Sequence, residues 1–563
     1  MDSDNILEVQ HLSIGFKDGD IVRQVINDVS FSLRRGETLG IVGESGSGKS
    51  VTSMSLMQLL PPNAVIIDGK ALFAQDENAE PIDLLQASHA QMQDIRGRRI
   101  AMIFQEPMTS LNPVHRCGKQ IDETLKRHTS LDATARKQRI LSLFREVMLP
   151  DPERTYRSFP HEISGGQKQR VMIAMALACN PDILIADEPT TALDVTVQRG
   201  IIDLLLSLQR RRHMAIIFVT HDLGVVSLVA HRVMVMYKGQ VVEEGTTERV
   251  LHHPTQPYTR GLLACRPPLD ARPQHLPTVQ DMLEGREIDT SLRATFVPPQ
   301  GSIPLLSVNG LKVDYAVKRN LWGHISRKLT AVDDVSFDLY EGETLGLVGE
   351  SGCGKTSIGR ALMGLISMAD GSVAYRGNNI SQLSRHERRN LCTKMQIVFQ
   401  DPYSSLNPRQ TIGQAILEPL RVHRGGSEAA LRAQVIDMMQ QVGLEPEWYS
   451  RFPHEFSGGQ RQRVCIARAL VLKPEMVVCD ESVSALDVSV QAQVLNLLND
   501  LKQRHGFSCL FITHDLSVVR FLADRVMVMQ RGKIEEMAEA DSIFNQPQTS
   551  YTQSLLDAVP RIG

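Results

Sequence analysis

Two short runs of mainly apolar residues, Thr38–Val42 and Thr344–Val348, each lead directly into a glycine-rich loop. Short runs without alternation predict strands that are buried on both faces. A helix is expected to begin at the lysine that closes each loop, Lys49 or Lys355. The order strand, glycine-rich loop and helix is the context in which such a loop binds phosphate.

The pattern around these loops predicts alternating strands and helices in both halves of the chain. Upstream, alternation of apolar and polar positions predicts strands at Ile6–Phe16, Ile21–Leu33, Leu305–Tyr315 and Thr330–Leu339. Downstream, apolar runs predict buried strands at Ile183–Ala186, Ile216–Val219, Met476–Cys479 and Cys509–Ile512. Polar helical segments are expected at His115–Pro150 and Arg409–Pro446, and amphipathic helices at Gln167–Cys179 and Gln460–Leu472. The predicted fold class is α/β with a largely parallel sheet in each half.

One series of motifs occurs twice in the same order. Ser164, Asp187 and His221 recur 293 positions later as Ser457, Asp480 and His514. A repeat of this length predicts two domains of one kind, which we place at residues 1–265 and 304–563. The intervening residues 266–303 are rich in proline and lack hydrophobic periodicity, which predicts a linker with semi-extended stretches.

Composition and charge exclude several classes of protein. The 563 residues carry a net charge of −3, which gives no electrostatic footprint for nucleic acid. The net charge does not exclude a local basic patch. The eight cysteines include no Cys-x-x-Cys pair, so no zinc or iron–sulfur spacing is present. The N-terminal residues are acidic, unlike a signal peptide, and no apolar run is long enough for a membrane span. We therefore expect a cytosolic protein unless a partner holds it at a membrane.

The two glycine-rich loops have the form Gly-x-x-x-x-Gly-Lys-Ser/Thr. Their glycines let backbone N–H groups turn toward phosphate oxygens, and the lysine adds positive charge. The helix that follows directs its positive N-terminal end at the same anion. A glycine-rich turn with a surface lysine is the alternative, which two copies in a full motif set disfavour. The predicted nucleotide-binding residues of the loops are Gly43, Glu44, Ser45, Gly46, Ser47, Gly48, Lys49, Ser50 and Val51, and Gly349, Glu350, Ser351, Gly352, Cys353, Gly354, Lys355, Thr356 and Ser357.

Two adjacent acids follow a buried strand in each half, Asp187-Glu188 and Asp480-Glu481. Ligands of open α/β sheets bind at this edge, and oxygen atoms suit Mg²⁺. The second acid is expected to orient or deprotonate the attacking water. A solvated acidic pair is the alternative, but the two carboxylates repel each other and a bound cation relieves that cost. The predicted metal-site residues are Ser50, Gln105, Asp187, Thr356, Gln400 and Asp480.

Further polar positions complete each set. Two predicted helix N-termini could bind a γ-phosphate, although an ordinary N-cap fits them almost as well; they comprise Ser164, Gly165, Gly166 and Gln167, and Ser457, Gly458, Gly459 and Gln460. A histidine after a buried strand could hydrogen-bond the γ-phosphate, and a glutamine after another could reach Mg²⁺ and the attacking water. The predicted catalytic residues are Glu188, His221, Glu481, His514, Gln105 and Gln400. Phe16 and Tyr315 could stack on a base, with core packing as the alternative.

On these motifs, nearly the whole chain outside the linker resembles ATP-binding cassette (ABC) ATPases. In that family Ser-Gly-Gly-Gln is the signature motif. The resemblance implies two tandem P-loop NTPase domains, each with a mostly parallel sheet core, an antiparallel β subdomain and a helical subdomain. Two departures are mild: Ile163 and Phe456 replace the usual leading leucine, and Ser482-Val483 replaces Pro-Thr. Both glutamates, Glu188 and Glu481, are kept, so two hydrolytic sites are expected.

The resemblance also implies a head-to-tail sandwich of the two domains, an intramolecular pseudo-dimer that binds two ATP with Mg²⁺. One ATP would lie between Lys49, Gln105, Glu188 and His221 of the first half and Ser457 and Gly459 of the second. The other would lie between Lys355, Gln400, Glu481 and His514 and the first half's Ser164 and Gly166. The D-loops would be Ala192-Leu193-Asp194 and Ala485-Leu486-Asp487.

A narrower resemblance is carried by residues 105–113 and 400–408, by Gly-Glu-Ser-Gly in both loops, and by the tails 253–259 and 548–552. These segments are similar to the oligopeptide/dipeptide/nickel importer subfamily, and the fused form resembles subunits of peptide, microcin C and glutathione importers. This implies an ATPase coupled to uptake of short peptides, bound peripherally at the cytoplasmic face of the inner membrane. Its partners would be two membrane-spanning permease subunits and an extracytoplasmic substrate-binding protein. The segments after Gln105 and Gln400 would pass motion to the permeases.

Other functions remain as alternatives. The cargo could be nickel, glutathione, an opine or an oligosaccharide. A soluble twin-cassette ATPase acting on ribosomes predicts a long, charged, helical linker, whereas residues 266–304 are short and proline-rich. A DNA-repair cassette ATPase predicts zinc cysteines or a long coiled coil, and the sequence indicates neither.

Overall fold

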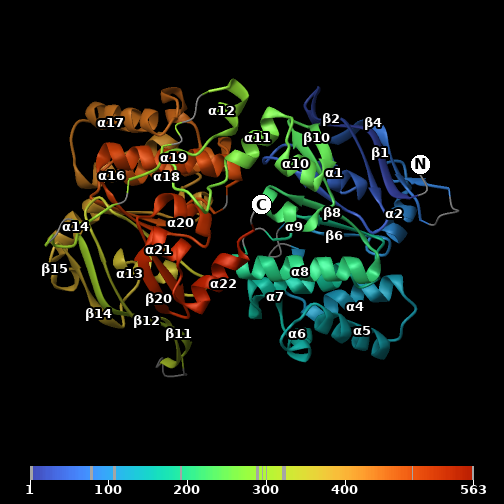
Figure 1. Ribbon diagram of the computed structural model, residues 1–563, viewed down its shortest axis with the longest axis horizontal. Helices are drawn as coiled ribbons and strands as arrows, with labels where there is room; N and C mark the ends of the chain where they lie inside the picture. The colour runs from blue at the N-terminus through green and yellow to red at the C-terminus, as the bar shows by residue number, and fades with distance from the viewer. Residues whose placement is uncertain are drawn as a thin grey trace. The chain divides into compact units, whose positions relative to one another are not determined.

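The computed structural model describes residues 4–75, 80–105, 110–190, 193–286, 289, 291–294, 296–298, 301–319, 325–484 and 486–560. By its internal contacts the chain divides into two compact units. Unit 1 contains residues 1–263 and 560–563, and unit 2 contains residues 264–559. Each unit has an antiparallel sheet, a mixed sheet and helices packed against them (Figure 1).

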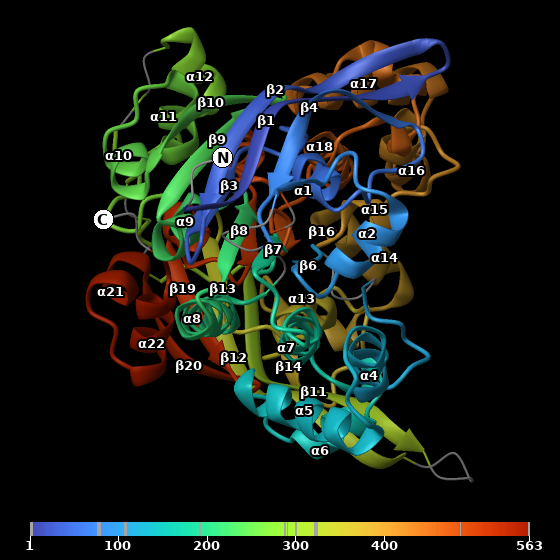
Figure 2. The ribbon, with the colours of Figure 1, turned by 90° about the vertical axis from the view of Figure 1, so that its right-hand side faces the viewer.

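The antiparallel sheet of unit 1 has the strand order β2-β1-β4-β5. Its long strand β1 (Asn5–Asp18) pairs with β2 (Ile21–Arg34) on one side and β4 (Ala64–Phe73) on the other, as Figure 2 shows. The short strand β5 (Ile82–Asp83) extends the sheet beyond β4. The two predicted strands of this region are therefore confirmed, each a little longer than the alternating pattern indicated.

The second sheet of unit 1 has the order β10-β9-β3-β8-β7-β6. All its strands are parallel except β10, because β10 pairs antiparallel with β9. Its members are β3 (Thr38–Val42), β6 (Ile100–Ile103), β7 (Ile183–Asp187), β8 (Ala215–Thr220), β9 (Arg232–Tyr237) and β10 (Gln240–Thr246). Val42 lies opposite Thr220 and Asp187 opposite Val219, so three strands end at one edge and bring their following residues together.

Helices flank this sheet. Helices α4, α5 and α6 pack on one another, and α4 and α5 also contact α7 (Figure 1). Ile121, Phe144 and Val171 from three of these helices share one buried core cluster. The helices of unit 1 are α1 (Lys49–Leu56), α2 (His89–Ile95), α4 (Cys117–His128), α5 (Ala133–Glu146), α6 (Pro152–Arg157), α7 (Gly165–Ala176), α8 (Val195–Arg212), α9 (Leu223–Val229), α10 (Thr247–His252) and α11 (Pro257–Ala264).

Unit 2 repeats this arrangement, with sheets ordered β12-β11-β14-β15 and β16-β17-β18-β13-β19-β20. Its strands are β11 (Leu306–Arg319), β12 (Ile325–Leu339), β13 (Thr344–Val348), β14 (Asp370–Tyr375), β15 (Asn378–Asn379), β16 (Met395–Val398), β17 (Met476–Asp480), β18 (Ser508–Ile512), β19 (Arg525–Gln530) and β20 (Lys533–Glu539). Its helices are α12 (Val279–Glu284), α13 (Lys355–Leu362), α14 (Arg385–Lys394), α15 (Pro402–Ser405), α16 (Ile412–His423), α17 (Glu428–Gln441), α18 (Gly458–Leu470), α19 (Val488–His505), α20 (Leu516–Leu522), α21 (Ala540–Asn545) and α22 (Ser550–Ala558).

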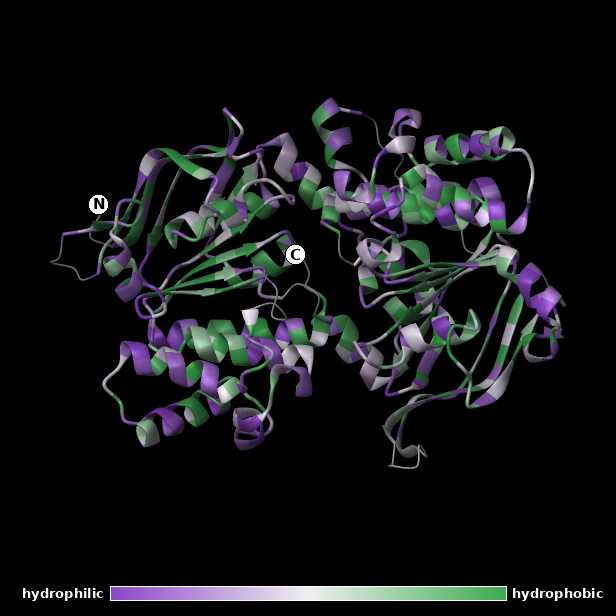
Figure 3. Ribbon diagram, turned by 180° about the vertical axis from the view of Figure 1, so that it is seen from behind, coloured by the Kyte–Doolittle hydropathy of each residue, from purple (hydrophilic) through white to green (hydrophobic). Residues whose placement is uncertain are grey.

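The α/β fold class is confirmed, with parallel sheet cores, antiparallel sheets and packed helices in both units. Hydrophobic residues line the central strands, whereas many helices carry hydrophilic faces (Figure 3). The sequence pattern did not separate the strand pair β9–β10 or its counterpart β19–β20, because the apolar stretch from Met214 to Met236 contains β8, α9 and β9 in succession. Among the residues that the structure describes, none of the helices combines the length and apolarity that crossing a bilayer requires.

Candidate nucleotide sites

The loop between β3 and α1 wraps around the side chain of Lys49. Lys49 is buried, and its ammonium donates to the carbonyl oxygens of Gly43 and Glu44, each at 2.8 Å. Gly43 has a φ of 150°, and a Cβ there would lie 2.2 Å from the carbonyl oxygen of Met236. Only glycine fits this position, and the loop therefore keeps its backbone close to β9.

The loop between β13 and α13 has the same form. The ammonium of Lys355 donates to the carbonyl oxygens of Gly349 at 2.8 Å and Glu350 at 2.9 Å. A Cβ on Gly349 would lie 2.2 Å from the carbonyl oxygen of Met529. In both loops the lysine is held by the loop's own carbonyls, and a bound phosphate would offer it stronger, charged acceptors.

A hydroxyl and a buried carboxylate meet beside each loop. Ser50 donates to Asp187 Oδ1 at 3.1 Å, and Thr356 donates to Asp480 Oδ1 at 2.9 Å. Burial raises the pKa of Asp187 to about 6 and raises the pKa of Asp480, because the charged carboxylates lack water. Mg²⁺ prefers oxygen ligands and would stabilise the ionised carboxylate, so this donor set fits the cation.

The second acid of each pair lies beside a glutamine and a histidine. Gln105 Nε2 donates to Glu188 Oε2 at 3.0 Å, and His221 Nδ1 lies 3.3 Å from the same oxygen. The backbone of Glu188 has a φ of 47°, in the left-handed region that non-glycine residues rarely adopt. The carboxylate contacts the residues that follow β6 and β8, Gln105 and His221. Backbone strain of this kind is concentrated at functional sites.

Glu481 repeats these contacts in unit 2. Gln400 Nε2 donates to Glu481 Oε2 at 2.7 Å, and His514 Nδ1 lies 3.6 Å from it. Lys355 Nζ lies 4.0 Å from the other carboxylate oxygen, and the φ of Glu481 is also 47°. Burial opposes charge on Glu481 and His514, but their mutual attraction outweighs it: the pKa of Glu481 is lowered and that of His514 is raised.

The two Ser-Gly-Gly-Gln segments form exposed helix N-termini. Ser164 and Ser457 are the N-caps of α7 and α18, and each exchanges capping-box hydrogen bonds with the glutamine three positions on. A Cβ on Gly166 would lie 2.8 Å from Val197, and one on Gly459 would lie 2.3 Å from Val490, so these glycines let each helix pack closely. Within the described part of unit 1, Ser164 forms hydrogen bonds with Gln167 and Lys168 of its own helix, and it forms none with the Lys49 loop.

Comparison with known proteins identifies this arrangement. The family described as ABC transporter matches residues 26–191 and 332–484, which contain both phosphate loops, both Ser-Gly-Gly-Gln segments and both acidic pairs. The chain belongs to the ABC transporter family. It is therefore an ATP-hydrolysing enzyme of the ABC type, and the predicted relationship to fused tandem-ATPase importer subunits is confirmed.

Individual relatives cover the whole of this ABC ATPase. It is 46% identical over 567 aligned residues to the Glutathione import ATP-binding protein GsiA of Shigella sonnei (strain Ss046), covering 100% of this chain and 90% of that protein. The GsiA protein of Escherichia coli (strain K12) matches with the same identity and coverage. The solved dimeric structure of MJ0796, a bacterial ABC transporter cassette, matches 42% of this chain and 98% of its own at 25% identity, with a TM-score of 0.38.

A second family match covers the ends of the two halves. The oligopeptide/dipeptide transporter C-terminal region matches residues 242–289 and 536–563 of this ABC ATPase. In the structure, the tail tyrosines contact the phosphate loops: the Glu44 N–H donates to Tyr258 Oη at 3.1 Å, and the Glu350 N–H donates to Tyr551 Oη at 3.4 Å. These tyrosines were missed as site residues, although the recurrence of the tails 293 positions apart was the signal that could have found them.

The remaining predicted positions differ between the halves. Tyr315 shares a hydrogen bond of 3.1 Å with Ser357 and is 39% exposed, so it lies beside its phosphate loop, and its stacking on a base stays a prediction. Phe16 lies half-buried on β1, where it is paired with Arg23 and Ala64. Asp194 caps α8, whereas Ala192, Ala485 and residues 106–109 after Gln105 lie outside the described residues.

Proposed function

We propose that this ABC ATPase drives a bacterial importer of short peptides, with glutathione as the first cargo to test. Two findings support this. Its relatives at 46% identity are glutathione import ATP-binding proteins. The ends of both halves match the oligopeptide/dipeptide transporter C-terminal region. Glutathione is itself a tripeptide, so both findings favour a short peptide as the cargo. Neither finding favours nickel, an opine or an oligosaccharide.

The observation that carries the ATPase mechanism is the pair of matched polar sets around Glu188 and Glu481. We assign Lys49 and Lys355 to the ATP phosphates, because each is an ammonium enclosed by its phosphate loop. The two glutamates accept a proton from the attacking water. Gln105 and Gln400 hold each carboxylate in place through the amide that donates to it.

The cation would be held beside this group. Ser50 with Asp187, and Thr356 with Asp480, would hold Mg²⁺ in the two sites. When bound, Mg²⁺ supplies positive charge that neutralises the phosphate oxygens. The histidines approach the carboxylates from the ends of β8 and β18, and we assign to His221 and His514 a hydrogen bond to the γ-phosphate.

We infer that each ATP is completed by the Ser-Gly-Gly-Gln helix of the other unit. Within unit 1, Ser164 bonds to Gln167 rather than to its own phosphate loop, so its exposed N-terminus is available to another partner. Lys49 would then share ATP with Ser457, and Lys355 with Ser164. We retain residues 1–265 and 304–563 as the two domains, joined by the linker 266–303.

The partners follow from the importer role. The chain itself has no helix fit to span a membrane among its described residues, so cargo must cross through other subunits. We propose two membrane-spanning permease subunits, an extracytoplasmic substrate-binding protein, and peripheral attachment at the cytoplasmic face of the inner membrane. The segments after Gln105 and Gln400 would contact the permeases.

Affinity purification of the tagged chain from detergent-solubilised membranes tests this proposal. We expect two multi-span proteins near 1:1:1 with this chain, and loss of labelled glutathione uptake when the gene is deleted. A Glu188→Gln plus Glu481→Gln chain, expressed in the deletion strain, should not restore uptake. Loss of dipeptide or nickel uptake with normal glutathione uptake would change the cargo. Recovery only with ribosomal or DNA-repair proteins would overturn the transport function.

A further inference from the structure

The proline-rich segment before the second cassette is bound to unit 2. The side chain of Asn496 on α19 donates to the carbonyl of Leu276 at 2.8 Å and accepts from its N–H at 2.9 Å. Asn499, one turn further along α19, donates to the carbonyl of Gln274 at 3.0 Å. Pro273 forms an antiparallel bridge with Leu292, so the segment folds back on itself beside α19.

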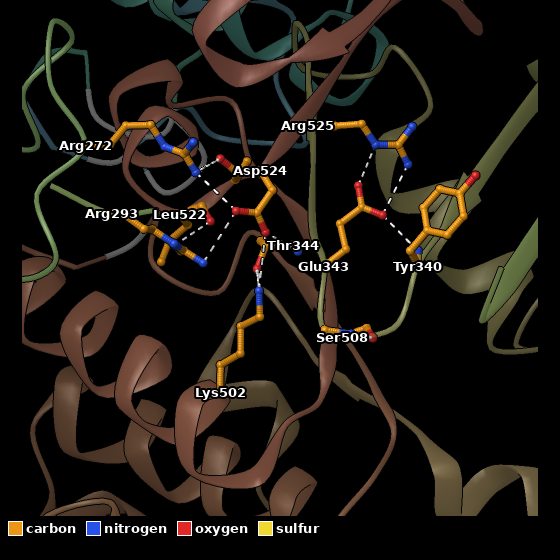
Figure 4. Close-up of polar contacts among 12 residues, drawn as sticks. Arg272, Arg293, Tyr340, Glu343, Thr344, Lys502, Ser508, Leu522, Asp524 and Arg525 are labelled. Carbon is orange, nitrogen blue, oxygen red and sulfur yellow. Dashed lines mark hydrogen bonds and ion pairs between the residues drawn. The ribbon is translucent and has the colours of Figure 1, made fainter. Parts of the chain in front are cut away.

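This fold-back carries two arginines to one buried carboxylate. Asp524, 3% exposed, lies 3.2 Å from Arg272 and 3.8 Å from Arg293 (Figure 4). Lys502 on α19 lies 3.5 Å from its other oxygen. Next to this cluster, Arg525 Nε lies 2.7 Å from Glu343 Oε1, so the charges of these two residues compensate each other. Three cations therefore share the charge of a single carboxylate, which leaves two positive charges uncompensated among the described residues of this cluster.

Two of the three cations, Arg293 and Lys502, line a cavity of about 400 Å³ together with Asp524, whereas Arg272 is not among its lining residues. Six polar residues contribute to its lining: Gln274, Arg293, Asn499, Lys502, Gln503 and Asp524. Exposed Gln503 connects the cavity to the surface. Burial lowers the pKa of both Arg293 and Lys502, since each charge is poorly hydrated where it lies. The buried Nε of Arg272 also has no hydrogen-bond partner in the described part of the chain.

We propose that this cavity binds a compact dianion that carries phosphate or carboxylate oxygens. Two negative charges would balance the cluster, and buried cations are stable where they are paired. Arginine and lysine are the side chains that recognise such oxygens, and the amide side chains of Gln274, Asn499 and Gln503 also line the cavity.

The site belongs to the second half alone. At the positions 293 residues earlier, Lys502, Asp524 and Asn499 are replaced by Gln209, His231 and Leu206. In unit 1 the Thr38 N–H donates to His231 Nδ1 at 3.0 Å, whereas in unit 2 the Thr344 N–H donates to Asp524 Oδ2 at 2.8 Å. An imidazole nitrogen thus accepts this hydrogen bond in unit 1 and a carboxylate oxygen accepts it in unit 2. The hydrogen bond alone does not require the charged cluster of unit 2.

Calorimetric titration of the full chain with inorganic phosphate tests the proposal. Both ATP sites are first filled with a non-hydrolysable ATP analogue and Mg²⁺, so that the phosphate loops are unavailable, and potassium chloride holds the ionic strength constant. We expect one phosphate per chain. Lys502→Gln, which introduces the residue found at Gln209, and Arg293→Gln should each weaken its affinity at least about tenfold, the usual effect of removing a charged hydrogen-bond donor.

Arg504→Gln is the matched control, because Arg504 is an exposed cation on the same helix and does not line the cavity. Its affinity for phosphate should equal that of the unchanged chain. A parallel titration with succinate distinguishes a carboxylate ligand from a phosphate. Failure of both anions to bind the unchanged chain would overturn the proposal, as would cavity variants that bind phosphate with the affinity of the unchanged chain. Neither result depends on what the importer carries.

Discussion

The hydroxyl of Tyr258 accepts a hydrogen bond from the backbone N–H of Glu44 at 3.1 Å, across 214 positions of the sequence. Tyr551 accepts from the Glu350 N–H in the second half. Tyr258 is buried, and its ring lies 4.2 Å from that of Tyr237 at the end of β9. The tail of each half is therefore attached to the second residue of its own phosphate loop.

Replacing Tyr258 and Tyr551 by Phe should loosen both loops. Each lost hydrogen bond costs about 0.5–1.5 kcal/mol, so we expect ATP affinity to fall up to about tenfold and melting to occur a few degrees lower. Binding of a fluorescent ATP analogue and thermal melting measure the two effects. Tyr156→Phe is the control, since that ring packs over Gly118 in the helical region away from the loop. Unchanged ATP affinity in the double variant would show that the tails do not support the loops.

Glu243 holds the turn from which this tail helix begins. Its carboxylate accepts from the N–H and hydroxyl of Thr255, both at 2.8 Å, and from the N–H of Gln256 at 3.2 Å. Burial opposes its charge, but these hydrogen bonds outweigh burial and lower its pKa. Its contribution to stability is therefore present above the unfolded-state pKa of about 4.5 and is lost as the pH falls through the lower folded-state value.

Glu243→Gln should accordingly destabilise unit 1 at neutral pH by about 1–3 kcal/mol, the cost of losing charged hydrogen bonds. The difference from the unchanged chain should shrink as the pH falls below about 4.5. Urea unfolding at a series of pH values measures both. Glu248→Gln, an exposed neighbour on α10, should change neither quantity. A difference that stays constant down to strong acid would contradict the assigned role of the carboxylate.

The local sequence pattern alone predicted which polar residues gather at the ends of the buried strands. Ser50 lies in the first turn of the helix that follows β3 and its loop, Asp187 ends β7, and His221 follows β8. Parallel pairing brings these strand ends to one edge of the sheet. The contacts of Tyr258 and Arg272 were not predictable in this way, because each joins segments more than 200 positions apart and depends on how the tail or the linker packs. The proline-rich composition of the linker indicated an extended chain. It did not indicate that Arg272 and Arg293 would contact the carboxylate of Asp524.

Replacing Glu188 and Glu481 together by Gln should separate ATP binding from hydrolysis. Glutamine keeps the size of the side chain but cannot take a proton from water, and loss of a general base lowers the rate by about 10²–10⁴-fold. We expect near-normal ATP binding and a hydrolysis rate reduced by at least a hundredfold, measured as phosphate release. Glu447→Gln, an exposed change in unit 2, is the control. Undiminished hydrolysis would reject the assignment of both glutamates.

Crossed substitutions test whether each ATP is shared between units. Ser457→Arg places a bulky cation at the N-terminus of α18 and should disable the site that contains Glu188. Glu188→Gln with Ser457→Arg would then damage one site only, and its hydrolysis should equal that of Glu188→Gln alone. Glu188→Gln with Ser164→Arg would damage both sites and should hydrolyse at least tenfold more slowly than either single variant. The opposite order of rates would place each signature with its own phosphate loop.

Arg468 joins the segment after Gln400 to the signature helix. Its guanidinium donates to the carbonyl of Ser405 at 2.5 Å, and Arg461 on the same helix lies 4.0 Å from the ring centre of Tyr403. Both arginines lie on α18, which begins directly after Ser457. A force on α15 would thus reach the helix that we assign to ATP binding.

Arg468→Met introduces the residue found at the corresponding position 175 of the first half. Removing a charged hydrogen bond of about 1.5–3 kcal/mol should weaken the attachment of α15 while leaving the catalytic groups in place. We expect ATP hydrolysis by the isolated chain to change less than about threefold, and cargo transported per ATP hydrolysed in membrane vesicles to fall several-fold. Arg409→Met, an exposed cation just beyond the segment, should leave that ratio unchanged. A normal ratio in the Arg468 variant would mean that α15 transmits nothing through this contact.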